Sequence, residues 1–378
     1  MSTPKYEWTL CESPSPDSPF APLRKIGLLS GAKQRTFNPV RNRAGSYSFQ
    51  IRTSDPMAYE IFDRVDMNDI CGTVRKCVRI RRNDRTLMSG PIWGINGSLD
   101  QGMVTINGVG WLETLQKKIL YNTADYTNGG YGIPADEIAF GLLNRINSQY
   151  IGRADDLPDA PLLVKPGNVF GGPLENRNRY YVLGQALGPA LQDMSDIEAG
   201  SDYVVDPDTR ELNLYNWDYY TTRYNVVLGY NWGPRNLSTF GWQESAPDMC
   251  NSEMVISQGA VVGPIGSGDS QGVYGVFEEY NTISGANQTV LAPYIGADLA
   301  IRQYPLLTYT MTPYPSSTES GSPTLFDDYD IGDAVFFTAR KDAIRILRQE
   351  TRIWGATVSL DDEENETVSQ LQITPSNQ

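Results

Sequence analysis

The chain has 378 residues, a formal net charge of −14 and no histidine. The absence of histidine excludes Ser-His-Asp and Cys-His catalysis and any His-ligated zinc or haem site. The negative charge argues against a nucleic acid as a stably bound partner, because phosphate contacts need a basic surface. The 22 Tyr and 7 Trp, together with 35 Gly and 24 Pro, favour strands and turns over long helices.

The four cysteines are Cys11, Cys71, Cys77 and Cys250. They lack paired CxxC spacing, so buried free thiols are favoured over a disulfide. The N-terminal segment has no apolar stretch of the signal-peptide kind, and no run reaches the ~20 apolar residues of a membrane span. We therefore expect synthesis in a cytoplasm and no membrane anchor.

The first third of the chain is predicted to be an arm followed by a β domain. Residues 1–22 form the arm, in which Tyr6 and Trp8 are placed to add to the edge of a sheet. Residues 23–120 form the first β domain. In it we expect a strand, where apolar and polar residues alternate, and two short helices: 46–52 for the strand, 58–62 and 111–120 for the helices.

The middle of the chain, 121–235, differs in composition and is predicted to be an α/β insertion. Pro134 begins an expected helix, since proline is tolerated in the first helical turn. After a Pro/Gly/Asn-rich loop, a second helix is expected over 181–197, with Pro189 kinking it or starting its second half. A hairpin over an Asp-Pro-Asp turn and a strand at 223–230 complete the insertion.

The last part of the chain, 236–378, is predicted to be a second β domain. A helix over 291–303 and a strand over 306–312 are expected before a Pro/Ser-rich linker. The Gly/Ser-rich stretch 259–275 is interpreted as a surface loop. It lacks the Gly-Lys-Ser/Thr of a P-loop, and no helical pattern follows it, so a phosphate cradle is disfavoured.

One stretch of the first β domain recurs in the second. Residues 69–100 and 330–361 align without a gap, and 10 of the 32 aligned positions are identical, where chance would give about two. Both copies alternate apolar and polar residues after a shared Trp, which indicates a half-buried strand. We therefore predict a mainly β fold with an α/β insertion and two β-barrel or sandwich domains related by internal duplication.

The repeat supplies matched pairs of candidate structural residues. Two pairs are expected to be packing anchors and the third to lie at hairpin tips: Trp93 with Trp354, Leu99 with Leu360, and Asp100 with Asp361. The acidic run that starts at Asp361 lacks the spaced oxygen ligands and central glycine of an EF-hand. A solvated hairpin tip is therefore favoured over a calcium site.

A basic cluster occupies the first copy of the repeat. Arg79, Arg81 and Arg85 are expected on one face of an alternating strand. We interpret this face as a docking surface for acidic protein neighbours. DNA contact is the less favoured alternative, given the overall charge.

Nothing in the sequence selects a catalytic residue, a cofactor or a metal ligand. Any two of the 45 acidic residues could form the carboxylate pair of a polysaccharide hydrolase, and no pair stands out. Trp217, Tyr219 and Tyr220 suit either the sugar-binding platform of an adhesin module or an inter-subunit surface. A carboxylate-based hydrolase and a carbohydrate-binding module therefore stay open as alternatives.

The order of a β meander, an α/β insertion and a second β meander resembles the baseplate hub proteins at the tip of phage tails. Local phrases are similar to minor tail proteins of long-tailed, siphovirus-type phages of actinobacteria. These phrases are the strand 46–52, Leu87-Met-Ser-Gly-Pro-Ile-Trp-Gly, Val104-Thr-Ile-Asn-Gly-Val-Gly-Trp-Leu, the stretch 191–206 and Ile331-Gly-Asp-Ala-Val-Phe-Phe.

This resemblance implies a structural virion protein and not an enzyme. In that family, each subunit of a homotrimer carries two tail-tube-like β domains, so three subunits place six similar domains around a channel. The implied role is a hub at the distal tip of the tail, which adapts the sixfold tube to threefold fibre proteins and gives DNA an exit. The implied partners are the distal tail or tail tube protein, other minor tail or receptor-binding fibre proteins, the tape measure protein and transient, non-specific DNA.

Overall fold

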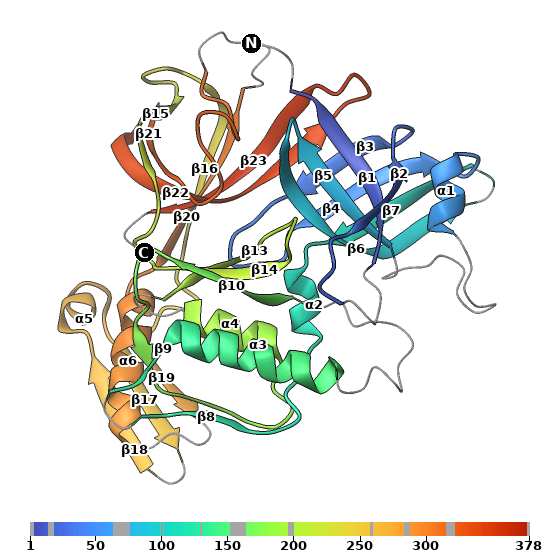
Figure 1. The fold of residues 1–378 in the computed structure, drawn as a ribbon. Coiled ribbons are helices and arrows are strands. Elements are labelled where there is room, and N and C mark those ends of the chain that lie inside the picture. Colours follow the sequence, from blue (N-terminus) through green and yellow to red (C-terminus); the bar gives the residue numbers. More distant parts are fainter. Residues whose placement is uncertain are drawn as a thin grey trace.

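The computed structural model describes residues 4–13, 19–62, 76–98, 100, 102–128, 131–151, 164–195, 200–257, 260–282, 288–314 and 322–375. Across these residues the fold is mainly β, and most strands join one 13-stranded sheet. Two β units lie side by side in the upper part of Figure 1, and two α/β lobes lie below them. The predicted fold class, mainly β with an α/β insertion, is confirmed.

The first β unit lies in the first third of the chain. Its elements are β1 (Tyr6–Glu12), β2 (Arg24–Leu28), β3 (Lys33–Asn38), β4 (Ser46–Arg52), α1 (Pro56–Ile61), β5 (Lys76–Arg82), β6 (Arg85–Ser98) and β7 (Met103–Val109). The strands lie in the order β3-β4-β7-β6-β5-β1-β2, and neighbours are antiparallel. The alternation in β4 buries Tyr47, Phe49 and Ile51, as a period of two requires.

The N-terminal segment, predicted to be an arm, is part of this unit. β1 lies between β2 and β5, inside the sheet. Tyr6 and Trp8 are only 3% and 2% exposed. The Trp8 ring meets the rings of Phe37, Tyr47 and Phe49 edge-on, at centroid distances of 6.2, 6.3 and 5.7 Å. Edge-to-face contacts of buried rings are favourable, so these contacts hold the segment in the core.

The second β unit repeats the strand order of the first. Its strands are β15 (Thr222–Tyr230), β16 (Leu237–Ser245), β20 (Leu306–Pro313), β21 (Ala334–Lys341), β22 (Ile344–Leu360) and β23 (Glu366–Pro375). They lie in the order β16-β20-β23-β22-β21-β15. This is the order of the first unit without β2, when β1, β3, β4, β5, β6 and β7 are matched in chain order. One pair differs in direction, because β15 is parallel to β21 whereas β1 is antiparallel to β5.

The first α/β lobe lies between β7 and β15. Its elements are α2 (Leu112–Gln116), β8 (Ala124–Tyr126), β9 (Ile133–Pro134), α3 (Ala135–Ile151), β10 (Lys165–Phe170), β11 (Asn176–Arg177), β12 (Arg179–Tyr181), α4 (Leu187–Ser195), β13 (Asp202–Val205) and β14 (Glu211–Tyr215). The predicted insertion ran to residue 235, whereas the observed lobe ends before β15. The boundary differs because β15 finds its partner, β21, more than a hundred residues away.

A second α/β lobe interrupts the second β unit between β16 and β20. It contains β17 (Ser252–Ser257), β18 (Ala260–Gly266), α5 (Gly268–Tyr274), β19 (Glu278–Thr282) and α6 (Gln288–Arg302), with a small core of its own. The predicted domain 236–378 is therefore split, and the stretch 259–275, expected as a loop, holds a strand and a short helix.

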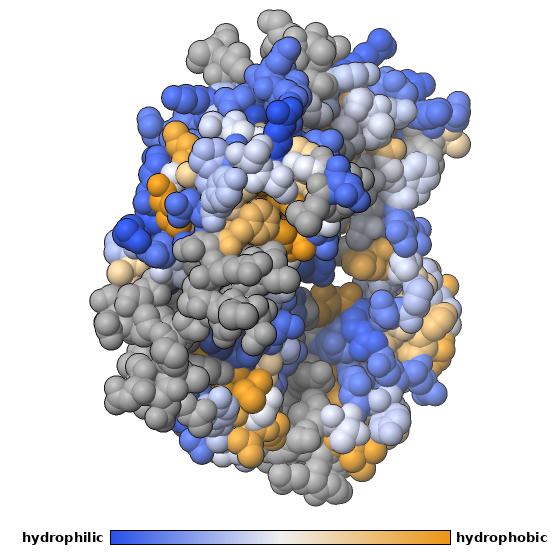
Figure 2. Space-filling model, turned by 90° about the vertical axis from the view of Figure 1, so that its right-hand side faces the viewer, coloured by the Kyte–Doolittle hydropathy of each residue, from blue (hydrophilic) through white to orange (hydrophobic). Residues whose placement is uncertain are grey.

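Seen from the side, the molecule is hollowed between its upper part and its lower part (Figure 2).

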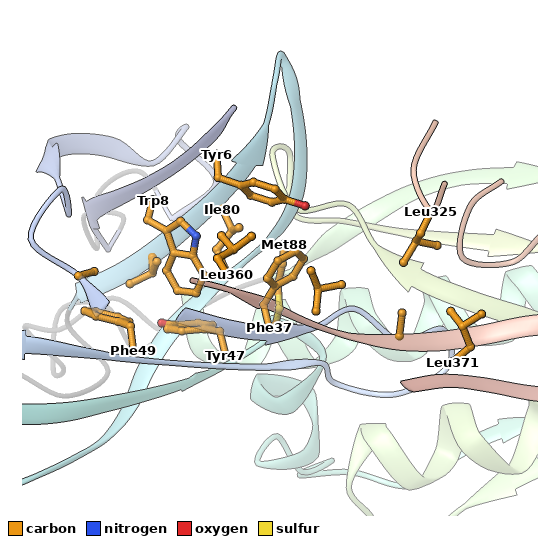
Figure 3. Close-up of a cluster of buried hydrophobic side chains, with 14 of the residues drawn as sticks. Tyr6, Trp8, Phe37, Tyr47, Phe49, Ile80, Met88, Leu325, Leu360 and Leu371 are labelled. Atoms are coloured by element: carbon orange, nitrogen blue, oxygen red, sulfur yellow. The ribbon is translucent and has the colours of Figure 1, made fainter. Parts of the chain in front are cut away.

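One hydrophobic cluster spans both β units. Phe37 and Tyr47 of the first unit and Leu360 and Leu371 of the second lie in the same buried layer (Figure 3). The two units are thus packed together as one body and not strung along the chain. None of the helices in the described ranges is long and apolar enough to cross a membrane.

Candidate functional site

The two β units meet at a ladder between β22 and β3. Residues 358–360 lie opposite 37–35 in antiparallel register, and a bridge between Gly355 and Val40 continues that register. The backbone N–H of Arg41 also donates to the carbonyl of Trp354, at 2.8 Å. The large sheet therefore runs through both units without a break. We call this ladder the internal joint.

Charged side chains at the end of β22 reinforce the internal joint. Lys33 Nζ lies 2.8 Å from Asp362 Oδ2, and Arg35 Nη1 lies 3.2 Å from Glu364 Oε1. Arg35 also donates to the carbonyl of Asp361, at 3.2 Å. The Lys33 pair is exposed and contributes little, but Arg35 is 6% exposed and is held more firmly. The turn after β22 is thereby anchored on the first unit.

The two predicted hairpin-tip residues lie in turns between matched strands. Asp100 is exposed between β6 and β7, and Asp361 is exposed between β22 and β23. The Asp361 carboxylate accepts hydrogen bonds from Asn365 Nδ2 and from the backbone N–H groups of Asn365 and Glu363, all at 2.8 Å. These bonds lower the pKa of Asp361. The acidic turn is thus an ordered part of the internal joint.

A buried ion pair forms a second contact between the β units. Arg82 on β5 is 4% exposed, and its Nε donates to Glu366 Oε2 on β23 at 2.9 Å. The other two guanidinium nitrogens donate to the carboxylate of Asp327, at 2.7 and 2.6 Å, and these bonds lower the pKa of Asp327. Tyr6 donates its hydroxyl to the same oxygen of Glu366 at 2.8 Å. One arginine thus ties two acidic residues of the second unit to the first.

The predicted docking face of Arg79, Arg81 and Arg85 is partly exposed. Arg85 forms an ion pair with Asp330 of the same chain, and Arg81 donates to the backbone carbonyl of Asp84 at 2.8 Å. Arg79 and Arg81 are half-buried. The acidic partner of Arg85 lies in the second β unit of the same chain, so docking of acidic neighbouring proteins on this face stays a prediction.

The two predicted tryptophan anchors occupy matching irregularities of the sheet. The register with the next strand shifts between Ile92 and Gly94 and, in the second unit, between Ile353 and Gly355. Each Trp is thus the extra residue of a β-bulge, which breaks the alternation on which the prediction rested. Trp93 and Trp354 are half-buried, whereas the residues before them are 0% exposed. The core anchors are therefore Ile92 and Ile353.

The two predicted leucine anchors have different outcomes. Leu360 is 3% exposed in the common core. Leu99, its counterpart in the first copy, lies outside the described residues, as does the start of that copy at 69–75. The matched strands can thus be compared up to residue 98.

The first lobe is attached to both β units through one buried carboxylate. Asp202 on β13 lies 3.3 Å from Arg41 Nε and forms an ion pair with Arg352 of β22. All three side chains are at most 8% exposed. Burial lowers the pKa of Arg41, and the charge of Asp202 acts against that shift. Asn42 adds a 2.7 Å hydrogen bond from its Nδ2 to Asp202 Oδ1. Three parts of the chain therefore converge on Asp202.

A cleft of about 340 Å³ lies beside this cluster, where the first lobe meets both β units. Tyr219 and Tyr220, two of the three predicted platform residues, line it. The Tyr219 ring stacks on Phe170 at 6.2 Å, and the Arg352 guanidinium lies 5.2 Å from the Tyr220 ring. Trp217 is 49% exposed. Tyr219 is 47% exposed and Tyr220 is half-buried, so the sugar-binding platform stays a prediction.

The cysteines were predicted to be buried free thiols. Cys11, Cys77 and Cys250 are free and buried, which confirms the prediction for these three. Cys11 and Cys77 lie opposite each other on β1 and β5. Cys71 lies outside the described residues. In the ranges that the structure describes, no group of three or more cysteine or acidic side chains is arranged to hold a metal ion.

Sequence reasoning missed the residues that hold the parts together. Arg82 and Asp202 carry no local signal, because their partners lie 284 and 150 residues away along the chain. Ile92 and Ile353 do carry one: they are identical in the two copies and directly precede the Trp-Gly pair. A bulge at Trp-Gly would have moved the core assignment by one residue.

The fold of this chain is similar to the folds of solved phage tail proteins. The prophage MuSo2 43 kDa tail protein from Shewanella oneidensis covers 98% of this chain and 98% of its own length, with a TM-score of 0.57 and 10% identity. A tail protein from Neisseria meningitidis MC58 covers 98% and 96%, with a TM-score of 0.57 and 11% identity.

A third solved structure, the prophage tail protein gp18 from Listeria monocytogenes EGD-e, covers 92% of this chain and 90% of its own, with a TM-score of 0.54 and 10% identity. At such identities the likeness is one of fold. No protein-family model matches the sequence, and no curated protein matches it significantly.

Proposed function

We propose that this chain is a structural protein of a phage tail and acts as a trimeric hub at the distal tip. Three subunits would place six β units around a channel, so that a threefold assembly fits the sixfold tail tube on one side and threefold tip or fibre proteins on the other. Its site of action is the virion, after synthesis in the host cytoplasm. The likeness to actinobacterial phages stays a prediction from the sequence phrases.

The observation that carries the proposal is the repeated strand order of the two β units. The six matched strands occur in the same chain order and pair in the same spatial order. The β-bulges at Trp93 and Trp354 also lie at equivalent positions of the two units. This agreement, together with the sequence repeat, supports an internal duplication, and a duplicated β unit is what an adaptor from sixfold to threefold symmetry requires. The fold shared with tail proteins over nearly the whole chain supports the same role.

The charge of the chain suits a channel through which DNA passes without binding. A net charge of −14 repels the phosphate backbone, so the DNA would slide and not adhere. The neighbours of the hub would be the distal tail or tube protein, the fibre proteins and the tape measure protein. Catalysis has no part in this proposal.

The mass of the purified chain in solution tests the proposal. We expect mass photometry to give a particle three times the 42.0 kDa of one chain, and negative-stain images to show a ring with a central hole. A monomer that binds glycans would contradict the hub and would favour the carbohydrate-binding alternative. A monomer that cleaves polysaccharides would favour the hydrolase.

A further inference from the structure

We infer that neighbouring subunits join by a copy of the internal joint, in which the end of β6 of one subunit pairs with β16 of the next. This inference rests on the proposed homotrimer and names the strand edges that build it. Its basis is the matching of the two β units. The strands of the internal joint, β22 and β3, have β6 and β16 as their counterparts.

Both counterpart edges are open in the single chain. β16 is the last strand of the large sheet, and across the described ranges it pairs only with β20. β6 pairs with β5 up to Pro91 and with β7 from Ile92 to Ser98. Within the described ranges, residues 92–98 of β6 have no partner strand on the edge that faces away from β7. An open edge is a template for a strand of another chain, and here a complementary edge exists on the same molecule.

A matched pair of glycines points to a missing neighbour at β6. A methyl group added at Gly355 would lie 2.9 Å from Val40 Cγ2 and 3.2 Å from the Pro39 carbonyl, so glycine allows the residues that follow β3 to approach. Gly94 is the identical residue of the first copy. A methyl group there would meet no described heavy atom within 4 Å, apart from its chain neighbours. A strand that approaches Gly94 from a second subunit would give this glycine the same role.

A matched pair of aromatic residues points to a missing neighbour at β16. Phe37 lies opposite Tyr47, and Trp242 lies opposite Tyr309. Tyr47 lies opposite Gly108, which lies opposite Ile92. In the second unit, Tyr309 lies opposite Ile373, which lies opposite Ile353. Tyr47 and Tyr309 are both buried and occupy equivalent positions. Phe37 is 0% exposed under the end of β22, whereas Trp242 is 53% exposed. Burial of this large ring would stabilise the joint between subunits.

The internal joint also fixes the register between subunits. Val358 lies opposite Phe37, so their counterparts Gly97 and Trp242 would face each other. Asn96 would then lie opposite Gln243, and Gly94 opposite Ser245. The arginine that holds the acidic turn at the internal joint has no equivalent on β16, where the position of Arg35 is taken by Phe240. The joint between subunits would therefore depend on backbone pairing and on Trp242. Each contact is heterologous, and a threefold axis closes it into a ring.

Cysteine cross-linking tests the register. Asn96 and Gln243 are both exposed, and directly opposed residues of antiparallel strands have Cα atoms about 4.5–5.5 Å apart, within the range of a disulfide. We expect the double variant N96C/Q243C to form covalent dimers and trimers on mild oxidation. The single variants N96C and Q243C keep all native cysteines and should stay uncross-linked. The variant N96C/S245C, two residues out of register, should cross-link far less.

The outcomes separate this inference from the proposed function. A native trimer that does not cross-link through N96C/Q243C overturns the strand pairing and leaves the hub intact. A chain that is monomeric at tens of micromolar overturns both. A covalent trimer supports both.

A glycine pair gives a second measurement. Gly94→Val should leave the melting temperature of the dilute monomer unchanged and weaken trimer formation at least about tenfold, which corresponds to roughly 1.4 kcal/mol. Gly355→Val should lower the melting temperature of the monomer itself, because Val40 blocks the side chain. If Gly94→Val assembles like the wild type, β6 is not the paired edge.

Discussion

Arg82 on β5 and Glu366 on β23 form an ion pair that is buried on both sides, with side-chain exposures of 4% and 6%. The two residues belong to different β units, so this pair stabilises the packing of one unit against the other. Breaking a buried ion pair by removing one partner leaves an uncompensated charge and costs about 3–5 kcal/mol.

Replacing Arg82 with Met should therefore lower the free energy of unfolding by about 3–5 kcal/mol. The double variant R82M/E366M should be less destabilised than the single one, since no buried charge is left alone. Urea denaturation measures both. The exposed pair of Arg24 with Glu12 supplies the control, because R24M should cost less than about 1 kcal/mol. Equal losses of unfolding free energy in R82M and R24M would show that Arg82 does not stabilise the contact between the two units.

The carboxylate of Asp202 is expected to hold the first lobe on the β units. The variant D202N removes the charge that Arg41 and Arg352 share in a buried place. We expect a loss of about 3–5 kcal/mol in the free energy of unfolding and faster hydrogen exchange in β13 and β14. Asp218 is exposed, so D218N should change stability by less than about 0.5 kcal/mol. Unchanged exchange in D202N would show that the lobe is held by other contacts.

Glu253 in the second lobe should make stability depend on pH near neutrality. Its side chain is 0% exposed, and its Oε1 accepts a hydrogen bond from Asn281 Nδ2. Burial raises the pKa of Glu253 from 4.5 to about 7, and the charge of Asp298 adds to the shift. The folded state thus binds a proton that the unfolded state releases, so stability should fall as the pH rises from about 4.5 to 7.

The variant E253Q isolates this effect. Gln cannot ionise and keeps an oxygen for the 2.8 Å hydrogen bond from Asn281. Relative to the wild type, E253Q should be more stable at pH 8 than at pH 5 by on the order of 1–3 kcal/mol. Urea titrations at the two pH values give this difference, in which the other titrating groups cancel. A difference of zero would place the pKa of Glu253 near its ordinary value.

The buried thiols should resist alkylation in the folded protein. Burial raises the pKa of Cys77 to about 12 and also raises that of Cys11. Because the thiolate is the reactive form, labelling of both at pH 8 should be far slower than in 6 M guanidinium. Peptide mapping by mass spectrometry follows each cysteine separately. Rapid native labelling of Cys77 would mean that β1 opens from β5 easily.

Local patterns in the sequence predicted the elements well where one face of the element is buried. The strand at 46–52 and the helices near 134–150 and 291–303 were found because their apolar residues follow a single period. The same patterns could not show which strands pair. The patterns therefore assign β15 to the insertion and the N-terminal strand to an arm, whereas both strands belong to the large sheet. Strand pairing over long distances depends on the whole fold.

The candidate site was predictable only in part, for two physical reasons. A β-bulge adds one residue and shifts the alternation of buried and exposed positions. The sequence pattern therefore predicts Trp93 and Trp354 as core residues, whereas Ile92 and Ile353 fill the core. Charged residues in an alternating strand look like a solvated face. Arg82 and Arg85 instead meet acids that the fold brings from the far end of the chain.

The common hydrophobic cluster of the two β units constrains how such a protein can change over time. Phe37 is covered by the end of β22, and Leu360 is covered by the first unit. Either β unit on its own would expose a large apolar surface to water. The two β units are therefore mutually dependent: each tolerates substitutions at its outer rim, but neither can be lost or exchanged without the other.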